Sequence, residues 1–376
     1  MTIAIDALGL DIKKAGVGNY ACYLLKAMAR LPFEAQIDVY VQRQVSVDFK
    51  DTAHMRFIVC DDFKGSGERI LYEQLKLPSM LRKGGYKAVH CLDYRTPVLP
   101  VPLRTVVTIH DLSYYLYPEC FTFGSRVLKQ ALTRLSLLKA DRVICVSENT
   151  GRDVLAKFPG MAKDRVRIIP LGIKEMNAGS IHEFNEYMKK IGINGKYILY
   201  IGTLEPRKNV ETLIAAYKRA VEVFGLKQRL LLCGKPGWKY EGIYRAALEA
   251  NLPGRIVFGG YAPEEVLPLL YENADMFVYP SLYEGFGLPV LEAMSRGVPV
   301  IASDTAALKE AAGQAALYFD PADSGALAGH MAKLSVDSPL REKMKQEGLM
   351  QASGFSWERT AGETLSVYRE LLMEGN

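Results

Sequence analysis

The segment YPSLYEGFGLPVLEAMSRGVPVIAS, residues 279–303, predicts one complete strand, helix and strand unit. An apolar run that ends near Pro280 is typical of a buried strand, and PVIAS is typical of the next one. Between them, Pro289 stands where the first turn of a helix tolerates a residue that has no amide hydrogen. Strand, helix and strand in this order form the repeating unit of a parallel sheet.

The same alternation of apolar runs and amphipathic segments extends along the whole chain. The predicted strands are TIAIDAL, QIDVYV, MRFIVC, AVHCL, RTVVTIHD and RVICVS in the first half, and YILYIG, RLLLCG, RIVFGG, MFVYPS and PVIAS in the second. Residues 125–138 form a predicted helix with these apolar residues at helical spacing: Val127, Leu128, Ala131, Leu135 and Leu138. Asn209 stands where it can cap the helix of ETLIAAYKRAVEVF. Each half repeats one architecture, so we predict an α/β protein with two Rossmann-like α/β/α domains.

The length of 376 residues exceeds the size at which a single hydrophobic core usually stops growing, which favours two domains. A predicted apolar strand, VRIIPLGI, ends before a polar segment at residues 174–195, and we read residues 170–173 as the hinge. The predicted domains are residues 1–172 and 173–355, followed by a final helix in residues 356–376. Low-complexity tracts and short repeats are absent, which gives scaffold functions little support.

The composition excludes several classes of protein. A net charge of +5 fits an anionic ligand, a membrane surface or an ordinary surface imbalance, and it is too diffuse to indicate nucleic acid. The six cysteines are scattered without a CxxC pair, so we expect reduced thiols and no metal bound by cysteine. Because no run approaches the roughly 20 apolar residues of a membrane-spanning helix and the start lacks a signal peptide, we expect a cytoplasmic protein.

Residues 284–292 carry the first candidate site. The amide groups around Phe286, Gly287 and Leu288 open a predicted helix, where the helix dipole favours a phosphate or a sugar hydroxyl. Glu284 lies in the preceding loop and Glu292 about one turn into the helix, so one carboxylate can hold a sugar and the other a ribose diol. Taken alone, such a pair is more often a loop residue and a solvated helix residue.

A basic pair follows the first strand of the same domain, in YIGTLEPRKN. Gly202 ends the strand, and Arg207 and Lys208 follow Pro206 at the carboxyl edge of the sheet, where open α/β sheets bind ligands. A guanidinium and an ammonium side by side can neutralise the charge on a departing diphosphate. Alone the pair reads as a solvated turn, but beside the glutamate segment it favours a phosphate site.

With these motifs the chain resembles glycosyltransferase family 4, retaining enzymes of the two-domain GT-B fold. The resemblance rests on the spacing of Glu284 and Glu292, the segments ADMFVYPS, VFGGYAPEEV, PLGI and CVSEN, and the basic pair, so it covers nearly the whole chain. It implies that two Rossmann-like domains face each other across a cleft, that residues 1–172 bind the acceptor and that residues 173–355 bind a nucleotide sugar. The final helix would cross back to the first domain, the alternative being a helix packed only on the second.

The resemblance also implies roles for residues of the second domain. Glu284 would touch the donor sugar, Glu292 would hold the ribose, and Arg207 and Lys208 would grip the diphosphate. Further donor contacts would come from the following residues: Gly202, Thr203, Phe286, Gly287, Leu288 and, at the nucleobase, Tyr261. Many relatives carry arginine directly after the strand-end glycine where this chain has Thr203, so Arg207 would take over that phosphate contact.

In the first domain, AGVGNY follows the first strand and resembles the family's glycine-rich loop, with Gly16 and Gly18 near the diphosphate. Glycine pairs also serve many ordinary turns. His110 ends the strand VVTIHDL and matches a family histidine beside the donor sugar, as a hydrogen-bond donor or proton shuttle. We read Asp111 as a turn or helix-cap residue.

The expected reaction is transfer of a hexose with retention, through an oxocarbenium-like state. The sequence has no Asp-x-Asp, so we expect neither a metal ion nor another cofactor, the donor being a co-substrate. The EPRKN motif resembles bacterial mannosyltransferases of polysaccharide assembly, which makes GDP-mannose the first candidate donor ahead of UDP sugars. The alternatives are a sugar-nucleotide epimerase or hydrolase of the same fold and a non-catalytic sugar-nucleotide-binding protein.

The predicted acceptor is a glycan or a lipid-linked glycan at the cytoplasmic leaflet. Basic residues on the helix at 125–138 and around residues 76–83 can meet anionic lipid headgroups, although a solvated face is the commoner meaning of such residues. Peripheral membrane contact is therefore an expectation, and no nucleic-acid partner is expected.

Overall fold

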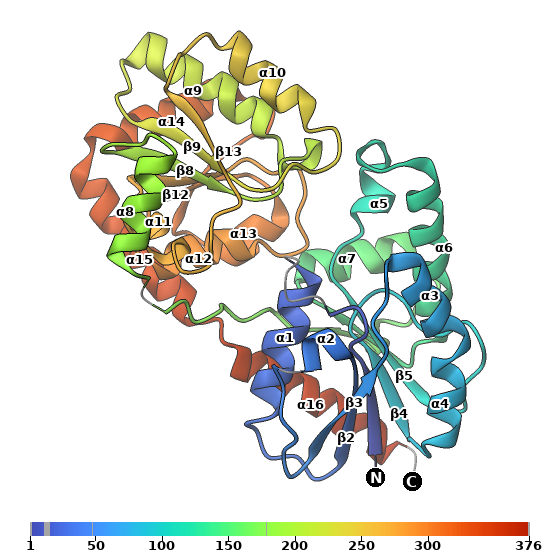
Figure 1. The fold of residues 1–376 in the computed structure, drawn as a ribbon. Helices are drawn as coiled ribbons and strands as arrows, with labels where there is room; N and C mark the ends of the chain where they lie inside the picture. Colours follow the sequence, from blue (N-terminus) through green and yellow to red (C-terminus); the bar gives the residue numbers. More distant parts are fainter. Residues whose placement is uncertain (1, 11–15, 47, 178, 375–376) are drawn as a thin grey trace. The chain divides into compact units, whose positions relative to one another are not determined.

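The computed structural model describes residues 2–10, 16–46, 48–177 and 179–374. They divide into two compact units, each built on a parallel sheet flanked by helices (Figure 1). Unit 1 comprises residues 1–116, 122–172 and 356–376, and unit 2 comprises residues 117–121 and 173–355. The predicted α/β fold class is confirmed. None of the helices in the described residues is both long and apolar enough to cross a membrane.

Unit 1 is built on a sheet of seven parallel strands in the order β3-β2-β1-β4-β5-β6-β7. The strands are β1 (Thr2–Asp6), β2 (Gln36–Gln42), β3 (Met55–Cys60), β4 (Ala88–Cys91), β5 (Arg104–Ile109), β6 (Arg142–Cys145) and β7 (Val166–Ile168). Its helices are α1 (Val17–Met28), α2 (Arg43–Ser46), α3 (Ser66–Leu75), α4 (Leu77–Lys83), α5 (Ser113–Leu116), α6 (Phe123–Lys139), α7 (Glu148–Lys157), the 3-10 turn η2 (Lys163–Arg165) and α16 (Trp357–Met373).

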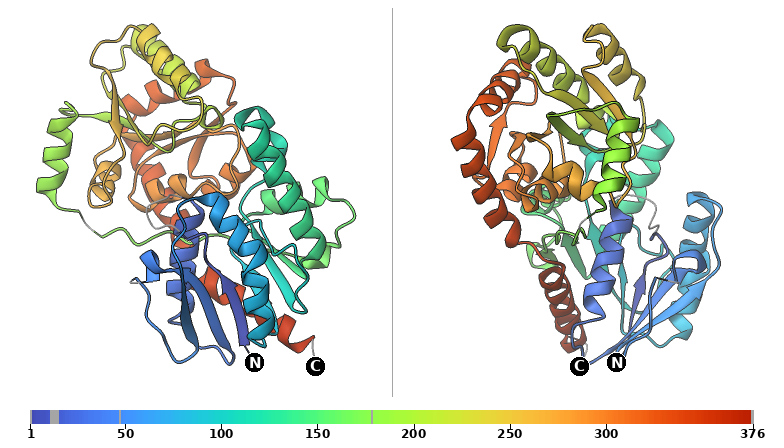
Figure 2. Two further views of the ribbon diagram at one scale, coloured as in Figure 1. Left: turned by 45° about the vertical axis from the view of Figure 1, so that its right-hand side comes forward. Right: turned by 60° about the vertical axis from the view of Figure 1, so that its left-hand side comes forward.

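The C-terminal helix α16 packs in unit 1 although it follows unit 2 in the chain. Figure 2 shows it, in red, beside the blue helix α1. Trp357 stacks on Tyr23 with ring centroids 5.7 Å apart, and the hydroxyl of Tyr368 lies 2.6 Å from Nδ1 of the buried His90. The last helix therefore completes the core of the first unit.

Unit 2 repeats the architecture with six parallel strands in the order β10-β9-β8-β11-β12-β13. They are β8 (Tyr197–Ile201), β9 (Arg229–Cys233), β10 (Ile256–Gly260), β11 (Met276–Tyr279), β12 (Val300–Ser303) and β13 (Ala316–Phe319). The helical elements are η1 (Pro118–Cys120), α8 (Ile181–Lys190), η3 (Pro206–Lys208), α9 (Val210–Phe224), α10 (Glu241–Glu249), α11 (Leu267–Glu272), α12 (Leu288–Ser295), α13 (Ala306–Ala312), α14 (Ser324–Val336) and α15 (Ser338–Ser353).

Three details differ from the sequence-based expectations. The short edge strand β13 is absent from the predicted strands, because ALYF is only four residues long and its alternation is too short to recognise. Asn209 precedes α9 as predicted, but its side chain makes no capping bond and instead donates to the carbonyls of Pro280 and Pro321. The apolar stripe of α6 faces outward, while its buried residues are Leu132, Thr133, Ser136 and Leu137.

In each sheet the strand order reverses beside the first strand, between β1 and β4 in unit 1 and between β8 and β11 in unit 2. The connections that leave these two strands diverge to opposite sides and open a crevice at their carboxyl ends, where such sheets bind ligands. Ligand sites are therefore expected in the loops after β1 and β4 of unit 1 and in the loops after β8 and β11 of unit 2.

One close backbone contact fixes the edge of the unit 2 crevice. A Cβ atom at Gly234, directly after β9, would lie 1.8 Å from the carbonyl oxygen of Gly202.

We expect Gly234→Ala to lower the free energy of unfolding by about 1–3 kcal/mol, as overpacking does, measured by urea denaturation. The control is Gly329→Ala inside α14, where an added Cβ meets nothing within 4 Å. That variant should gain roughly 0.5–1 kcal/mol, and equal stability of both variants would contradict the contact.

Candidate active site

The loops that follow β8 and β11 meet at the crevice of unit 2. The strands pair in parallel, Met276 with Ile198 and Phe277 with Leu199, so both chains leave the sheet at the same edge. The carbonyl oxygen of Arg207 then accepts hydrogen bonds from the amide of Leu282 at 2.9 Å and from the hydroxyl of Ser281 at 3.2 Å. Backbone contacts thus bring the basic pair and the first glutamate together.

Glu284 is buried at this junction, and both of its carboxylate oxygens have partners. Oε1 accepts from the ammonium of Lys208 at 2.6 Å and from the hydroxyl of Ser281 at 2.5 Å. Oε2 lies 3.3 Å from the guanidinium of Arg207. Lys208 also donates to the hydroxyl of Tyr279 at 2.7 Å, so its chain is held at two points. Three residues that the sequence assigned to donor binding form one cluster.

Burial and the neighbouring charges have opposite effects on the pKa values of Glu284 and Lys208. Burial alone raises the pKa of Glu284, but the neighbouring Lys208 and Arg207 outweigh it and hold the pKa at about 2. Burial lowers the pKa of Lys208, an effect that Glu284 partly offsets. We conclude that both groups are charged at neutral pH, because each supplies the counter-charge that the other needs in a buried place.

Arg207 links the cluster to a further carboxylate. Its guanidinium donates to Glu205 at 2.8 Å and to the carbonyl of Tyr283 at 2.7 Å. The four groups Glu205, Arg207, Lys208 and Glu284 carry two positive and two negative charges and therefore sum to zero. To bind a diphosphate, Arg207 would have to break its ion pair with Glu205 or Glu284.

The start of α12 supplies a second source of positive potential. Gly287 precedes the helix with φ 112° and ψ 37°, a conformation that favours glycine, and a Cβ there would lie 2.7 Å from the Leu308 side chain. Pro289 lies in the first turn, as predicted, so its missing amide costs no hydrogen bond. Amides of the residues from Phe286 to Leu288 then stand at the positive end of the helix dipole.

Glu292 lies apart from the Glu284 cluster, on α12. Its Oε2 accepts a hydrogen bond from the hydroxyl of Tyr271 at 3.0 Å, and burial raises its pKa despite the nearby cation of Lys174. A carboxylate anchored on one oxygen keeps acceptor capacity on the other. This arrangement suits a partner that donates two adjacent hydroxyls.

Three further predicted donor contacts lie after strands β8 and β10. Tyr261 follows β10 with half of its surface exposed, and the ammonium of Lys235, after β9, lies 4.4 Å from its ring centroid. Gly202 follows β8, and the carbonyl of Thr203 accepts from the hydroxyl of Tyr200 at 3.2 Å. The ammonium of Lys235 therefore lies over one face of the Tyr261 ring.

His110 follows β5 in unit 1. Its Nε2 lies 2.9 Å from the carbonyl oxygen of Leu92, which can only accept, so Nε2 is the donor of this hydrogen bond. The ring packs edge-on against Tyr20 with centroids 4.6 Å apart. Asp111 accepts from the amide and hydroxyl of Ser113 and caps α5, as expected.

The predicted glycine-rich loop is only partly described. Ala15, the first residue of AGVGNY, lies outside the described residues. Gly16 directly precedes α1 and accepts from the amide of Tyr20 at 3.0 Å, and Gly18 is buried within the helix. These two glycines therefore lie where the chain passes from the loop after β1 into α1.

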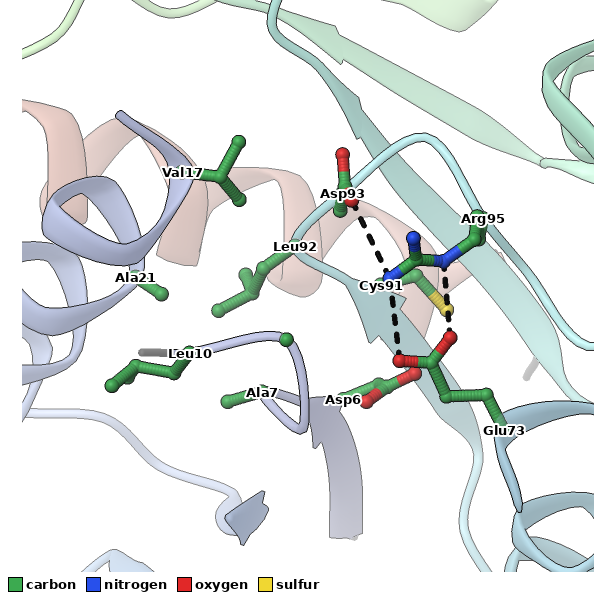
Figure 3. Close-up of a pocket in the computed structure, with 11 residues that line it drawn as sticks. Asp6, Ala7, Leu10, Val17, Ala21, Glu73, Cys91, Leu92, Asp93 and Arg95 are labelled. Carbon is green, nitrogen blue, oxygen red and sulfur yellow. Dashed lines mark hydrogen bonds and ion pairs between the residues drawn. The ribbon is translucent and has the colours of Figure 1, made fainter. Parts of the chain in front are cut away.

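A small pocket that is partly open to solvent lies at the crevice of unit 1, beside β1 and β4 (Figure 3). Figure 3 shows the guanidinium of Arg95 between two carboxylates, Glu73 at 3.0 Å and Asp93 at 3.5 Å. Asp6, at the end of β1, lies on the same side, and its Oδ1 accepts from the amide of Leu8 at 3.1 Å. Small and apolar residues line the opposite wall: Ala7, Leu10, Val17, Ala21 and Leu92.

The charged groups that line this pocket are buried to different extents. Burial, together with the nearby Glu73, raises the pKa of Asp6 to about 7. Burial also raises the pKa of Glu73, although Arg95 and Arg69 oppose the shift. Asp93 keeps about a fifth of its side chain exposed. The pocket thus offers carboxylate acceptors and a guanidinium donor, a set that suits a neutral ligand rich in hydroxyl groups.

Comparison with known proteins identifies the family. Residues 15–175 match the family described as Glycosyltransferase Family 4, and residues 183–350 match the family described as Glycosyl transferases group 1. The O-antigen chain mannosyltransferase B of Escherichia coli is 36% identical over 274 residues, which cover 71% of this chain and 71% of the relative. The chain belongs to glycosyltransferase family 4.

Other relatives agree with this assignment. The O-antigen chain mannosyltransferase RfbU of Salmonella typhimurium is 26% identical over 332 residues, covering 86% of this chain and 87% of its own. The structure of HepE from Anabaena in complex with UDP and glucose superposes with a TM-score of 0.75 at 17% identity, covering 98% and 100% of the two chains. This family 4 glycosyltransferase therefore has the GT-B fold that the resemblance implied.

Several site residues of this glycosyltransferase escaped the sequence analysis. Glu205, Ser281 and Tyr279 bind the basic pair and Glu284, and Lys235 stands against Tyr261. Lys235 could have been predicted from its position directly after the strand-end glycine of RLLLCGKPG. Thr203 occupies the same position after the strand-end glycine Gly202. The carboxylate and arginine pocket of unit 1 brings Asp6 together with Glu73, Asp93 and Arg95, which lie more than 60 residues further along the chain, and it has no comparable local signal.

The buried ion pair predicts a specific dependence of stability on pH. Since the pKa of Glu284 falls from 4.5 to about 2 on folding, its contribution is complete above pH 4.5 and is lost as the pH falls towards 2. The stability gap between wild type and Glu284→Gln should therefore shrink by roughly 3 kcal/mol between pH 6 and pH 2.5, measured by urea unfolding.

The control for this titration is Glu249→Gln on the exposed side of α10. Its gap to wild type should stay constant over the same range of pH. A constant gap for Glu284→Gln as well would show that the carboxylate is not held ionised by its partners.

Proposed function

We propose that this glycosyltransferase transfers mannose from GDP-mannose to a glycan acceptor, with retention of anomeric configuration and without a metal ion. The mannosyl donor is supported by the two O-antigen mannosyltransferases among its relatives. The observation that carries the proposal is the buried junction of Arg207, Lys208 and Glu284 at the crevice of unit 2, beside the start of α12.

In this proposal each donor contact has a counterpart in unit 2. The nucleobase stacks on Tyr261, the ribose diol binds Glu292, and the diphosphate lies against Arg207 and the amides at the start of α12. Glu284 accepts hydrogen bonds from the sugar hydroxyls. The chain of Lys208 is held by Tyr279 and Glu284, so its ammonium acts as a fixed charge rather than a mobile one.

The reaction step follows from these charges. The bond from the anomeric carbon to the phosphate oxygen breaks, negative charge grows on the diphosphate, and Arg207 and Lys208 stabilise it electrostatically. The acceptor hydroxyl adds to the face that the nucleotide leaves, and its proton passes to the departing phosphate. Because two fixed cations and a helix dipole serve the leaving group, we propose that no divalent metal is required.

The acceptor is proposed to be a glycan, carried on a lipid, whose terminal sugar binds the pocket of unit 1. Carboxylates and a guanidinium are the usual partners of sugar hydroxyls. Asp93 is the most accessible of the carboxylates and therefore the best candidate for direct contact.

The first test removes the charge of Arg207, since replacing the buried Lys208 would leave Glu284 without its main partner. Arg207→Met should lower kcat with GDP-mannose by about 10² to 10³, the usual effect of losing one transition-state donor. Arg245→Met, an exposed change on α10, is the control. Turnover is measured with radiolabelled GDP-mannose, UDP-glucose and dTDP sugars in the presence of a lipid extract, with and without EDTA.

The outcomes of this assay separate the candidate functions. Labelled product that forms only when acceptor is present supports a transferase, and release of free sugar from the donor indicates a hydrolase. Conversion of the sugar while it stays on the nucleotide indicates an epimerase. Tight binding of the sugar nucleotide without turnover indicates a non-catalytic protein. Turnover with UDP-glucose alone would overturn the mannosyl donor, and loss of turnover with EDTA would overturn metal independence.

The acceptor pocket makes a second prediction. Asp93→Asn removes one carboxylate from the pocket, so the KM for the acceptor should rise at least tenfold, because the sugar loses a hydrogen bond to a charged acceptor. The thermal shift caused by GDP should stay unchanged. Asp164→Asn, on an exposed turn of the same unit, serves as the control. An unchanged acceptor KM would place the acceptor elsewhere.

A further inference from the structure

Four polar side chains lie buried between the sheet of unit 1 and two of its helices. Nδ1 of His90, on β4, lies 2.6 Å from the hydroxyl of Tyr368, on α16. Nε2 of the same ring lies 2.8 Å from the hydroxyl of Thr108, on β5. That hydroxyl lies 3.1 Å from the hydroxyl of Tyr20, on α1. All four residues are at most 2% exposed, and their hydrogen bonds join them into one buried path: Tyr20, Thr108, His90 and Tyr368.

The imidazole in the middle of the buried path is neutral. Burial lowers the pKa of His90 to about 3, so the ring carries no charge at neutral pH. A neutral imidazole has one nitrogen that donates and one that accepts, so one neighbouring hydroxyl donates to the ring and the other accepts from it. Each link is therefore a hydrogen bond between neutral groups, and removing one hydroxyl breaks the path at a known place.

The buried path ends beside His110. This histidine directly follows β5, two residues beyond Thr108, so both side chains lie on the same face of the sheet. The ring of Tyr20 packs edge-on against the imidazole with centroids 4.6 Å apart, and Nε2 of His110 donates to the carbonyl of Leu92. Unlike the four residues of the path, His110 is partly exposed. The path thus reaches solvent at the carboxyl end of the sheet, where such sheets bind ligands.

Helix α16 contacts Tyr20 in two ways. Tyr368 reaches the hydroxyl of Tyr20 through the buried path, and the ring of Trp357 lies 6.0 Å from the ring of Tyr20 between centroids. Trp357 and Tyr368 lie about three turns apart and therefore on one face of α16. The ring and the hydroxyl of Tyr20 both depend on this last helix of the chain.

The attachment of α16 to unit 1 does not by itself explain the buried path. The helix buries Ala361, Leu365 and Leu371, and its Glu370 pairs with Arg167 at 2.7 Å, so other contacts already anchor it. Burying hydroxyls and an imidazole costs free energy that an apolar core would avoid. Buried polar networks that are fully bonded give rigidity in return. The groups that gain a fixed geometry here are the ring of Tyr20 and the imidazole packed against it.

We propose that the buried path holds the imidazole of His110 in one orientation for the transfer step, with Tyr20 in direct contact. The residues of the path are positioning residues, since they act through His110 rather than on a substrate. The inference rests on the proposed function, because it supposes that His110 takes part in the transfer. It also gives α16 a role in activity, through its contacts with Tyr20.

Removing single hydroxyl groups tests the proposal, because it breaks the path and leaves the rings in place. Tyr20→Phe and Thr108→Val should each lower kcat with radiolabelled GDP-mannose by about tenfold to a hundredfold, as misplacement of a catalytic group does. The KM for GDP-mannose should stay unchanged. Thr108→Ser keeps the hydroxyl and should restore most of the activity. Tyr368→Phe should have a smaller effect, because His90 keeps its bond to Thr108.

The matched control is Tyr40→Phe, which removes another buried hydroxyl from unit 1. Tyr40 is 3% exposed and its hydroxyl lies 2.8 Å from that of Tyr86, so the melting temperature should fall about as much as in Tyr20→Phe. Its kcat should equal that of the wild type. A loss of kcat as large as that of Tyr20→Phe would assign the effect to stability and overturn the proposal.

A double-mutant cycle with His110→Ala separates positioning from a general structural role. If the path acts through His110, Tyr20→Phe and Thr108→Val should lower kcat no further in the His110→Ala background. An equal fold loss in both backgrounds would overturn the proposal. Full activity of His110→Ala would also overturn it and would leave the transferase assignment intact.

Nuclear magnetic resonance makes the test independent of turnover. The chain has five histidines, and in protein labelled with nitrogen-15 histidine the ring signals of His110 are those missing from His110→Ala. Their chemical shifts should change in Thr108→Val and stay constant in Tyr40→Phe. Shifts that are unchanged in Thr108→Val would overturn the positioning role. Wild-type protein without turnover on any sugar nucleotide would contradict the proposed function, and the same shifts would still decide whether the path orients His110.

Discussion

The ammonium of Lys208 and the carboxylate of Glu284 lie 2.6 Å apart in a place that excludes most water. Neither charge would be stable there alone, because removing one partner leaves the other buried without compensation. The pair ties the loop after β8 to the loop after β11 across the point where the strand order reverses. The position of Arg207, the entry into α12 and the shape of the crevice all depend on those two loops.

Both units use one topology for different chemistry. In unit 2 the crevice combines two cations, two carboxylates and the start of a helix. In unit 1 the crevice holds Asp6, Glu73 and Asp93 around Arg95. The difference lies in the residues at the strand ends, since the sheets themselves repeat the same order around their first strands.

Helices α6 and α12 both carry an apolar stripe, but the stripe faces solvent in α6 and the core in α12. In α12 the apolar residues face the core, and the polar Glu292 binds Tyr271 at the side of the helix. In α6 the apolar residues face solvent, and Thr133 and Ser136 bind the unit through hydrogen bonds. Periodicity locates an apolar stripe in both cases, but the direction in which the stripe faces is set by the neighbouring elements.

The sequence by itself determined the α/β class, most of the strands, and the motifs that placed Arg207, Lys208 and Glu284 at strand ends, because periodicity and glycine or proline punctuation are local signals. It missed β13, the partners Glu205 and Ser281, and the pocket around Arg95. Only the tertiary structure decided that Glu284 is ionised against Lys208, that Nε2 of His110 bonds to the carbonyl of Leu92, and that α6 turns its apolar face outward. These properties depend on contacts between segments distant in the chain, which no local pattern encodes.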